Sequence, residues 1–371
     1  MGTGRWRYRS LPIGAHVWIG RANNGAPLAQ LGPSTIPNPK LVPLVSTTDE
    51  AGLEARFLND RLGLDFTYYN RVTTKDIVSA TISPTSGFTS AVFNVGKITN
   101  KGIELLLSYR VGNDKGLTWE PSLNLAYNKS EVVALYGDLT QITSDNARSQ
   151  TAYIAQEIGK PYDELQVVAF QRNAAGQIEY DASGMPIAAT KLKDMGTGVS
   201  PLTTGFSNTF RYKNFNLSFL IDAKFGGVIY SGTQALAYRY GLAKETLPGR
   251  ETGVTGPGVE AADGKTPNTQ VVQAEAYYTN LYNFGEPFVF KSDFIKLRTI
   301  SFGYTIPHDK ISRTPFKEVT VSLVARNFWT IKKYTPNIDP ESDYSSGNAQ
   351  GLEFTGMPIT KTMGVNVNLK F

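Results

Sequence analysis

Few residues in this 371-residue sequence have the types and spacing that catalysis or metal binding requires. Cysteine is absent, which excludes disulfides, zinc–thiolate sites, iron–sulfur clusters and thiol catalysis. The two histidines, His16 and His308, lie far apart in the sequence, so a His-rich metal site or a His-dependent triad has little material. We therefore predict no catalytic residues, no cofactor, no metal site and no enzymatic function.

Three polar segments match ligand-binding motifs only in part. Gly258–Thr266 ends in the GKT of a phosphate loop, but five residues separate its glycines where the motif needs four, so we expect a solvated loop. Asn173–Gly184 lacks the ligand spacing of a calcium loop and is predicted to form a small hairpin that turns at its two glycines. Asp339, Glu341 and Asp343 could hold a hard cation if the backbone curled around one, although such a cluster is more often a solvated loop face.

The composition favours strands. Lys and Arg number 37 against 32 Asp and Glu, giving a net charge of +5 that is dispersed rather than gathered into the basic patch of a nucleic-acid-binding protein. Only 19% of residues are charged, while 19 Tyr, 19 Phe, 35 Gly and 20 Pro supply strand and turn formers. No run of 18 apolar residues is present, so we predict no transmembrane helix.

Hydrophobic residues alternate with polar ones over much of the sequence. In the last such segment, Val365, Val367 and Leu369 lie on one face of a strand, whereas Asn366 and Asn368 lie on the other. This period of two predicts strands with one apolar and one polar face. The clearest alternating segments are Arg61–Arg71, Lys101–Arg110, Leu117–Asn128, Phe215–Lys224, Val319–Arg326 and Met363–Phe371.

The length of these strands and of their connections is typical of an outer-membrane barrel. Each strand is about ten residues long, which is the length that crosses a bilayer at a tilt. Aromatic residues cluster at strand ends, as in the girdles that lie at the membrane surfaces. Short turns alternate with long loops, which are predicted at 72–100, 129–201, 227–291 and 331–361.

This pattern predicts about nine or ten long antiparallel strands, the first descending from about Ala51 and the last ending at Phe371. Residues 1–50 read as a Pro- and Gly-rich external loop with one partial strand near Gly14–Gly20, and residues 51–371 as the barrel part. Bacterial single-chain barrels have an even number of strands, and an open edge in lipid is costly, so an incomplete barrel is expected. The lumen would be lined by residues such as Glu104, Asn124, Asp222 and Lys370.

A soluble or surface-attached β-rich binding module is the alternative, because the strands of a β-sandwich also alternate. In that case aromatic loops would bind the ligand. The external tyrosines could stack on sugar rings or peptide side chains, or they could pack within their own loops. These tyrosines are Tyr230, Tyr238, Tyr240, Tyr277, Tyr278 and Tyr282.

Several of these segments resemble the barrel of SusC/RagA-type TonB-linked outer-membrane transporters of Bacteroidetes. The resemblance runs in order from about Asp49 to Phe371. The segments that carry it are FLNDRLGLDFTYYNR, NVGKITNKGIELLLSYR, LAYNKSEVVALYG, GFSNTFRYKNFNLSFLIDAKFGG, DFIKLRTISFGYTIP, VSLVARNFW, NIDPESDYSSGNAQGLEFTGMP and GVNVNLKF.

The resemblance implies TonB-dependent uptake of an oligosaccharide or peptide across the outer membrane, with a SusD-like surface lipoprotein as a lid. It matches only the C-terminal barrel part, so we expect no plug domain here and expect TonB to act through N-terminal parts that this sequence lacks. Phe371, an aromatic last residue on an alternating strand, resembles the insertion signal read by the barrel-assembly machinery. The other expected partner is outer-membrane lipid, with no nucleic acid. A transporter fragment without function is a further alternative.

Overall fold

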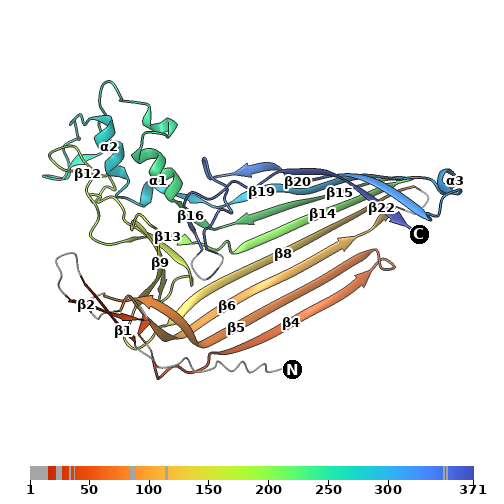
Figure 1. The fold of residues 1–371 in the computed structure, drawn as a ribbon, viewed down its shortest axis with the longest axis horizontal. Helices are drawn as coiled ribbons and strands as arrows, with labels where there is room; N and C mark the ends of the chain where they lie inside the picture. Colours follow the sequence, from red (N-terminus) through yellow and green to blue (C-terminus); the bar gives the residue numbers. More distant parts are fainter. Residues whose placement is uncertain are drawn as a thin grey trace.

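The computed structural model describes residues 16–21, 27–32, 35–36, 38–83, 85, 88–112, 116–345, 347 and 350–371. One sheet of long strands dominates these residues, and a smaller lobe with two helices lies at one end of it (Figure 1). The sheet contains β4 Val45–Phe57, β5 Leu62–Thr81, β6 Ser90–Tyr109, β8 Leu117–Ala134, β14 Leu202–Tyr212, β15 Phe215–Phe225, β19 Phe294–Thr305, β20 Glu318–Lys333 and β22 Thr362–Lys370, with the short β3 Thr35–Ile36 and β7 Val111–Gly112 beside it.

The lobe has its own small sheets and a hydrophobic core. Among the described residues, none of its helices is long and apolar enough to cross a membrane. Its elements are β9 Gln141–Asn146, β10 Ala152–Glu157, β11 Glu164–Val167, β12 Glu179–Tyr180, β13 Lys193–Thr197, β16 Val228–Ser231, α1 Gly232–Arg239, η2 Lys244–Thr246, β17 Val259–Glu260, α2 Ala274–Leu281, η3 Glu286–Phe288, β18 Val289–Lys291 and β21 Leu352–Glu353. The helix α3, His308–Ile311, lies at the opposite end of the sheet, and a separate hairpin consists of β1 His16–Arg21 and β2 Pro27–Gly32.

The strands of the large sheet follow the order β22-β20-β19-β15-β14-β8-β6-β5-β4, and each neighbouring pair is antiparallel. Within the described part of the chain β4 and β22 do not pair, so the sheet is open at both edges. The predicted all-β class is confirmed. The absence of a plug and the strand number of a whole barrel stay predictions.

The register of the sheet confirms the predicted alternation. Phe66 lies opposite both Leu53 and Leu105, so apolar side chains continue across three strands. Thr67 and Glu104 form the adjacent pair on the other face. Asn124, Asp222 and Lys370, the other residues predicted to line a lumen, lie on the same polar face. Their positions follow from the strand pairing and from the alternation of side chains along each strand.

The apolar face is exposed rather than packed against a second sheet. Leu323, Val365 and Met363 are 61%, 65% and 72% exposed, and many other large apolar residues on this face are also exposed. The two buried hydrophobic clusters among the described residues lie beyond the apolar stripes, in the lobe and at the adjoining strand ends. An exposed apolar surface of this extent indicates contact with lipid or with a partner. It disfavours the β-sandwich alternative, which would bury the face.

The short turns gather at the α3 end of the sheet, where the C-terminus also lies (Figure 1). The turn between β4 and β5 places Asn59 and Asp60 at positive φ, a conformation that these two residue types tolerate well. The ring of Phe215 contacts those of Phe302 and Tyr304, with centroids 5.8 and 4.9 Å away. This arrangement is what an aromatic girdle requires.

Two expectations about length were wrong. The strands β5 and β6 each contain 20 residues, about twice what a bilayer requires. Most of the predicted loop 72–100 is therefore a continuation of these strands, because its Thr, Val and Ile residues favour the same ladder. The strand β4 begins at Val45 rather than near Ala51, and β1 overlaps the partial strand expected near Gly14–Gly20, of which Gly14 lies outside the described residues.

We predict that Leu105→Arg or Val367→Arg lowers the free energy of unfolding by about 2–4 kcal/mol, because a guanidinium near the bilayer midplane loses its hydration. Asp at either position should cost less. Unfolding in lipid vesicles, followed by tryptophan fluorescence, would measure the change.

The matched controls are Glu104→Arg and Asn366→Arg, which change the neighbouring residues on the polar face. These two variants should be close to neutral. Near-neutral effects at both Leu105 and Val367 would argue against a lipid-facing surface.

Candidate functional site

A buried ion network joins the polar face of the sheet to the last long loop, between β20 and β22. Lys296 of β19 is only 3% exposed, and its Nζ lies 2.8 Å from both Asp339 Oδ1 and Glu341 Oε2. Arg298, at a β-bulge in the same strand, lies 2.8 Å from Glu341 Oε2 and also donates to Asp222. The network therefore attaches the loop to the sheet wall.

This network rules out both interpretations of the acidic cluster for Asp339 and Glu341. Asp339 and Glu341 are neutralised by side chains of the sheet, so neither interpretation, a cation site nor a solvated loop face, describes them. Burial alone would raise the pKa of Glu341, but hydrogen bonds and charges from Lys296 and Arg298 outweigh it and lower that pKa. Within the described ranges, no group of three or more His, Cys, Asp or Glu could hold a metal ion.

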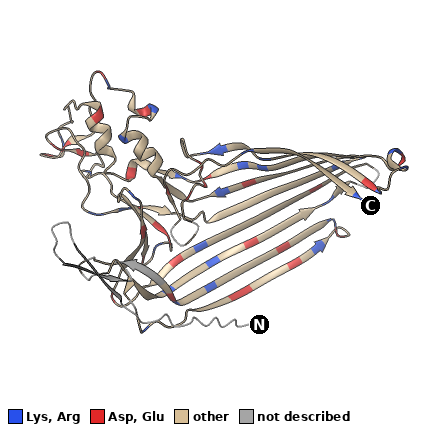
Figure 2. Cartoon of the chain, in the orientation of Figure 1, with Lys and Arg blue, Asp and Glu red and all other residues tan. Residues whose placement is uncertain are grey.

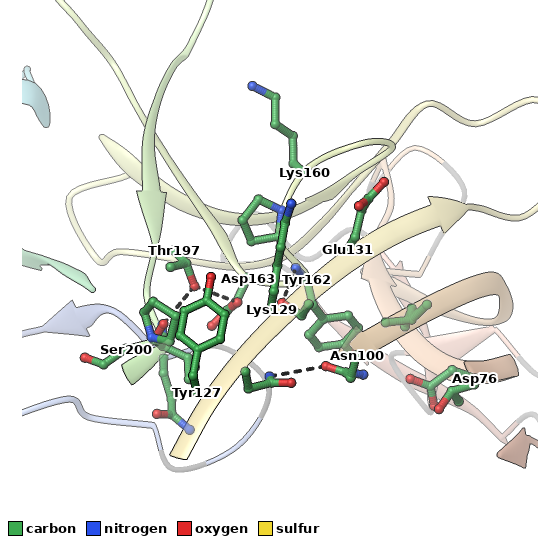
Figure 3. Close-up of a pocket in the computed structure, with 18 of the residues that line it drawn as sticks. Asp76, Asn100, Tyr127, Lys129, Glu131, Lys160, Tyr162, Asp163, Thr197 and Ser200 are labelled. Carbon is green, nitrogen blue, oxygen red and sulfur yellow. Dashed lines mark hydrogen bonds between the residues drawn. The ribbon is translucent and has the colours of Figure 1, made fainter. Parts of the chain in front are cut away.

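A polar cavity of about 560 Å³ lies where the outer end of β8 separates from β14 (Figure 3). The pairing of the two strands ends at Tyr127 and Leu202. Beyond that point the edge of β8 bonds to loop residues, since Asn128 donates its N–H to the carbonyl of Pro201 and Val132 to that of Lys160. Most of the residues that line the cavity have polar side chains, including Asn100, Asn128, Lys129, Asp163, Thr197 and Ser200.

Asp163 is a buried carboxyl group in the wall of this cavity. It is 4% exposed, and its Oδ1 accepts a hydrogen bond of 3.0 Å from the Thr197 hydroxyl. Its Oδ2 has no hydrogen-bond partner among the described residues. Burial raises the pKa of Asp163 above its ordinary value.

A second cavity, of about 330 Å³, adjoins the first and shares Val199, Ser200 and Gln350 with it. Asp343 lines this second cavity, and its Oδ1 accepts a hydrogen bond of 2.9 Å from the Gly351 amide. Burial raises the pKa of Asp343 to about 6. Together the two cavities form a polar recess at the lobe end of the sheet.

Among the described residues, the remaining sequence motifs form turns and a hairpin, and they show no ligand site. In Gly258–Thr266, Asp263 accepts hydrogen bonds from the amides of Lys265 and Thr266, which makes a tight turn rather than a phosphate cradle. Asn173–Gly184 forms the predicted hairpin, with Gly176 and Gly184 both at a φ of +81°. His308 is exposed at the start of α3.

The external tyrosines mostly pack within the lobe. Tyr230 and Tyr277 belong to its buried core, and the ring of Tyr238 contacts Tyr278 and Phe288 edge to face. Tyr240 is 65% exposed. Loop packing is therefore the better interpretation for most of this group.

The predicted lumen residues differ in what they contact. Asp222 belongs to the ion network, whereas Glu104, Asn124 and Lys370 lie on the polar face without lining either cavity. Lys296 and Arg298 were missed, although two cations close together in a strand with an apolar face were a signal that they have acidic partners. Asp163 offered no such signal, because no residue near it in the sequence indicates that a loop will bury its side chain.

The comparison with known proteins gives one family. The family described as TonB dependent receptor-like, beta-barrel matches residues 19–327. TonB-dependent receptor P3 of Formosa agariphila is 26% identical over 354 residues, which cover 87% of this chain and 34% of that protein. TonB-dependent receptor SusC of Bacteroides thetaiotaomicron is 23% identical over 352 residues, which cover 88% and 32%.

Solved structures of the RagAB peptide importer share the fold. The closed-closed state gives a TM-score of 0.71 at 19% identity, covering 96% of this chain and 38% of that one. A second RagAB structure gives a TM-score of 0.69 at 21% identity, with the same coverage. The chain thus spans about a third of the length of the curated relatives that it matches. These relatives are receptors and transporters rather than enzymes, as predicted.

We predict that Lys296→Met destabilises the protein by about 3 kcal/mol, the low end of the range for a broken buried pair, because the partly buried Asp339 loses the buried ammonium group that neutralises it. Denaturant unfolding would measure the loss, and proteolysis of the loop between β20 and β22 would show where the protein opens. The control is Lys361→Met, which removes an exposed cation from the same loop.

Adding Asp339→Asn to Lys296→Met should recover part of the lost stability, because it removes the uncompensated charge. If Lys296→Met behaves like Lys361→Met, the network does not hold the loop.

Proposed function

The chain belongs to the TonB-dependent receptor-like β-barrel family, and we propose that it forms the C-terminal barrel portion of an outer-membrane transporter. In this proposal the transporter takes up a nutrient, an oligosaccharide or a peptide, with energy supplied through TonB. The substrate would move along the polar face, which leads to the recess at the lobe end of the sheet.

One observation carries the proposal: among the described residues, the sheet has an exposed apolar face and an opposite polar face, with the lobe at one end of the sheet. The first face suits the hydrocarbon of a bilayer, and the second suits an aqueous lumen. Figure 2 shows that acidic and basic residues are interspersed along β4, β5 and β6 rather than gathered into one basic stripe. No nucleic-acid partner is therefore proposed.

The orientation follows from the asymmetry of the connections. Short turns of outer-membrane barrels face the periplasm, so the α3 end would be periplasmic and the lobe extracellular. The recess then lies at the outer mouth, where a solute first meets the transporter. A SusD-like surface lipoprotein would cover this mouth as a lid.

The substrate class comes from the relatives. The RagAB structures are of a peptide importer, and the resemblance to SusC/RagA-type transporters implies an oligosaccharide or a peptide. Both classes need a wide polar path with hydrogen-bonding groups, which the polar face supplies. In this proposal, coupling to TonB would run through the N-terminal parts of the transporter, which include its plug.

Fractionation of cell membranes, blotted with an antibody to the Thr355–Phe371 peptide, tests the proposal. We expect the signal in the outer membrane. A band well above 40.6 kDa there would identify this chain as the tail of a complete transporter. A band at 40.6 kDa would indicate a stand-alone fragment, and a signal only in the soluble fraction would contradict the proposal.

We also predict that Phe371→Ala lowers the amount of protein assembled in the outer membrane, because the terminal aromatic residue acts as the insertion signal. Phe371 also contacts Phe316, with ring centroids 5.1 Å apart, so the variant loses a girdle contact as well. Heat-modifiable mobility on gels of isolated outer membranes would measure assembly.

Phe316→Ala is the matched control, since it removes the same contact and keeps the terminal residue. Assembly should fall in Phe371→Ala and persist in Phe316→Ala. Equal assembly in the two variants would contradict the role of Phe371 as an insertion signal and would leave it only a contact in the aromatic girdle.

A further inference from the structure

Two carboxyl groups at the recess, the buried Asp163 and the half-buried Asp343, have no cation of their own. Neither Asp163 nor Asp343 forms an ion pair with any residue that the structure describes. Each has one oxygen that accepts a hydrogen bond, from Thr197 and from Gly351. The second oxygen of Asp163 has no partner at all among the described residues. Buried charge without a counter-charge is costly, so the recess is incomplete as it stands.

Lys129 and Lys160 line the first cavity, where Lys160 pairs with Asp194. The cations at the second cavity are already engaged with other carboxylates. Lys296 and Arg298 bind Asp339, Glu341 and Asp222. Lys224 lines the second cavity, but its Nζ lies 3.6 Å from Glu341 Oε1. The charges that act on Asp343 are therefore Lys224 of β15, Asp163 of the lobe and Glu341 of its own loop, and the last two oppose its ionisation.

The hydroxyl group of Ser292 in the recess also lacks a hydrogen-bond partner among the described residues. Ser292, between β18 and β19, lines the second cavity and is 7% exposed. Unpartnered oxygens from two separate segments, Asp163 Oδ2 and Ser292 Oγ, thus belong to residues that line the two adjoining cavities. The observation at Ser292 is independent of the acidic residues.

The missing group can be identified by its chemistry. An ammonium group brings a positive charge and three donors, which match two carboxyl groups and a hydroxyl. A neutral sugar hydroxyl could fill one hydrogen bond but would leave the charge uncompensated. A metal ion does not fit, because the described residues provide no cluster of three or more metal-binding side chains.

We propose that the second cavity forms a subsite for an ammonium group of the transported solute, with Asp343 as the direct acceptor and Asp163, in the wall of the adjoining cavity, as a supporting charge. The inference rests on the proposed function, because it assumes that the bound solute is the transported one. It narrows the class of transported solute to molecules that carry an amine. The amine could come from a basic peptide or from an amino sugar, which share this chemistry.

Calorimetric titration of the protein extracted from outer membranes in detergent tests the subsite without requiring transport. The probes are trilysine and the trisaccharide of glucosamine, each compared with its fully N-acetylated form. We expect at least one free amine to bind and its acetylated form to bind at least about 10-fold more weakly, which is the usual scale for losing a charged hydrogen bond. The probe that binds identifies the source.

Asp343→Asn should weaken binding of that probe by about 10-fold to 100-fold, and Asp163→Asn should weaken it less. Asp309→Asn, an exposed carboxylate in α3 at the far end of the sheet, is the matched control and should change nothing. Binding should also weaken between about pH 8 and about pH 5, since protonated Asp343 no longer offers a charge.

Equal binding of free and acetylated probes, no binding of either amine, or unchanged binding in Asp343→Asn would overturn the inference. The acetylation comparison uses the unaltered protein, so it decides even if a variant fails to fold. An outer-membrane location without amine binding would reject the subsite alone, whereas a soluble location would reject the proposed function.

Discussion

The structure depends on one constraint: inside hydrocarbon, every backbone N–H and C=O must find its partner within protein. The large sheet meets most of this constraint with antiparallel ladders, the longest between β5 and β6. Bulges interrupt the ladders between β6 and β8, β15 and β19, and β19 and β20. The free edges of β4 and β22 have no strand partner among the described residues. In a membrane these edges have to be paired by further strands, which accords with relatives about three times as long as this chain.

The same ladders place apolar side chains on one face of the sheet and polar side chains on the other. Since side chains alternate along each strand, a register that aligns Phe66 with Leu105 must also align Thr67 with Glu104. The sheet therefore has no hydrophobic core beneath its apolar stripes, and the lobe supplies one instead around residues such as Tyr230 and Phe288. The ion network at Lys296 connects the lobe end of the wall to the last loop, so the shape of the outer recess depends on both parts.

The sequence was most informative where the cause is local. Strands such as Met363–Phe371 follow from alternation alone, and the hairpin at Asn173–Gly184 follows from its glycines. The recess could not be predicted in this way. Its ion network joins Lys296 to Asp339, 43 residues later, and the burial of Asp163 depends on how the segment at Thr197 folds back over it. The 20-residue strands were underestimated because the expected length was taken from the bilayer, whereas β5 and β6 continue beyond it.

The central claim is that one face of this sheet contacts lipid and the other contacts water. Because the chain has no cysteine, single cysteines introduced along β6 at 103–108 could each carry a unique spin label. In outer-membrane vesicles, labels at 103, 105 and 107 should be accessible to lipid-soluble oxygen, and those at 104, 106 and 108 to a water-soluble nickel complex. Accessibility to the nickel complex at all six positions, without alternation, would contradict the account.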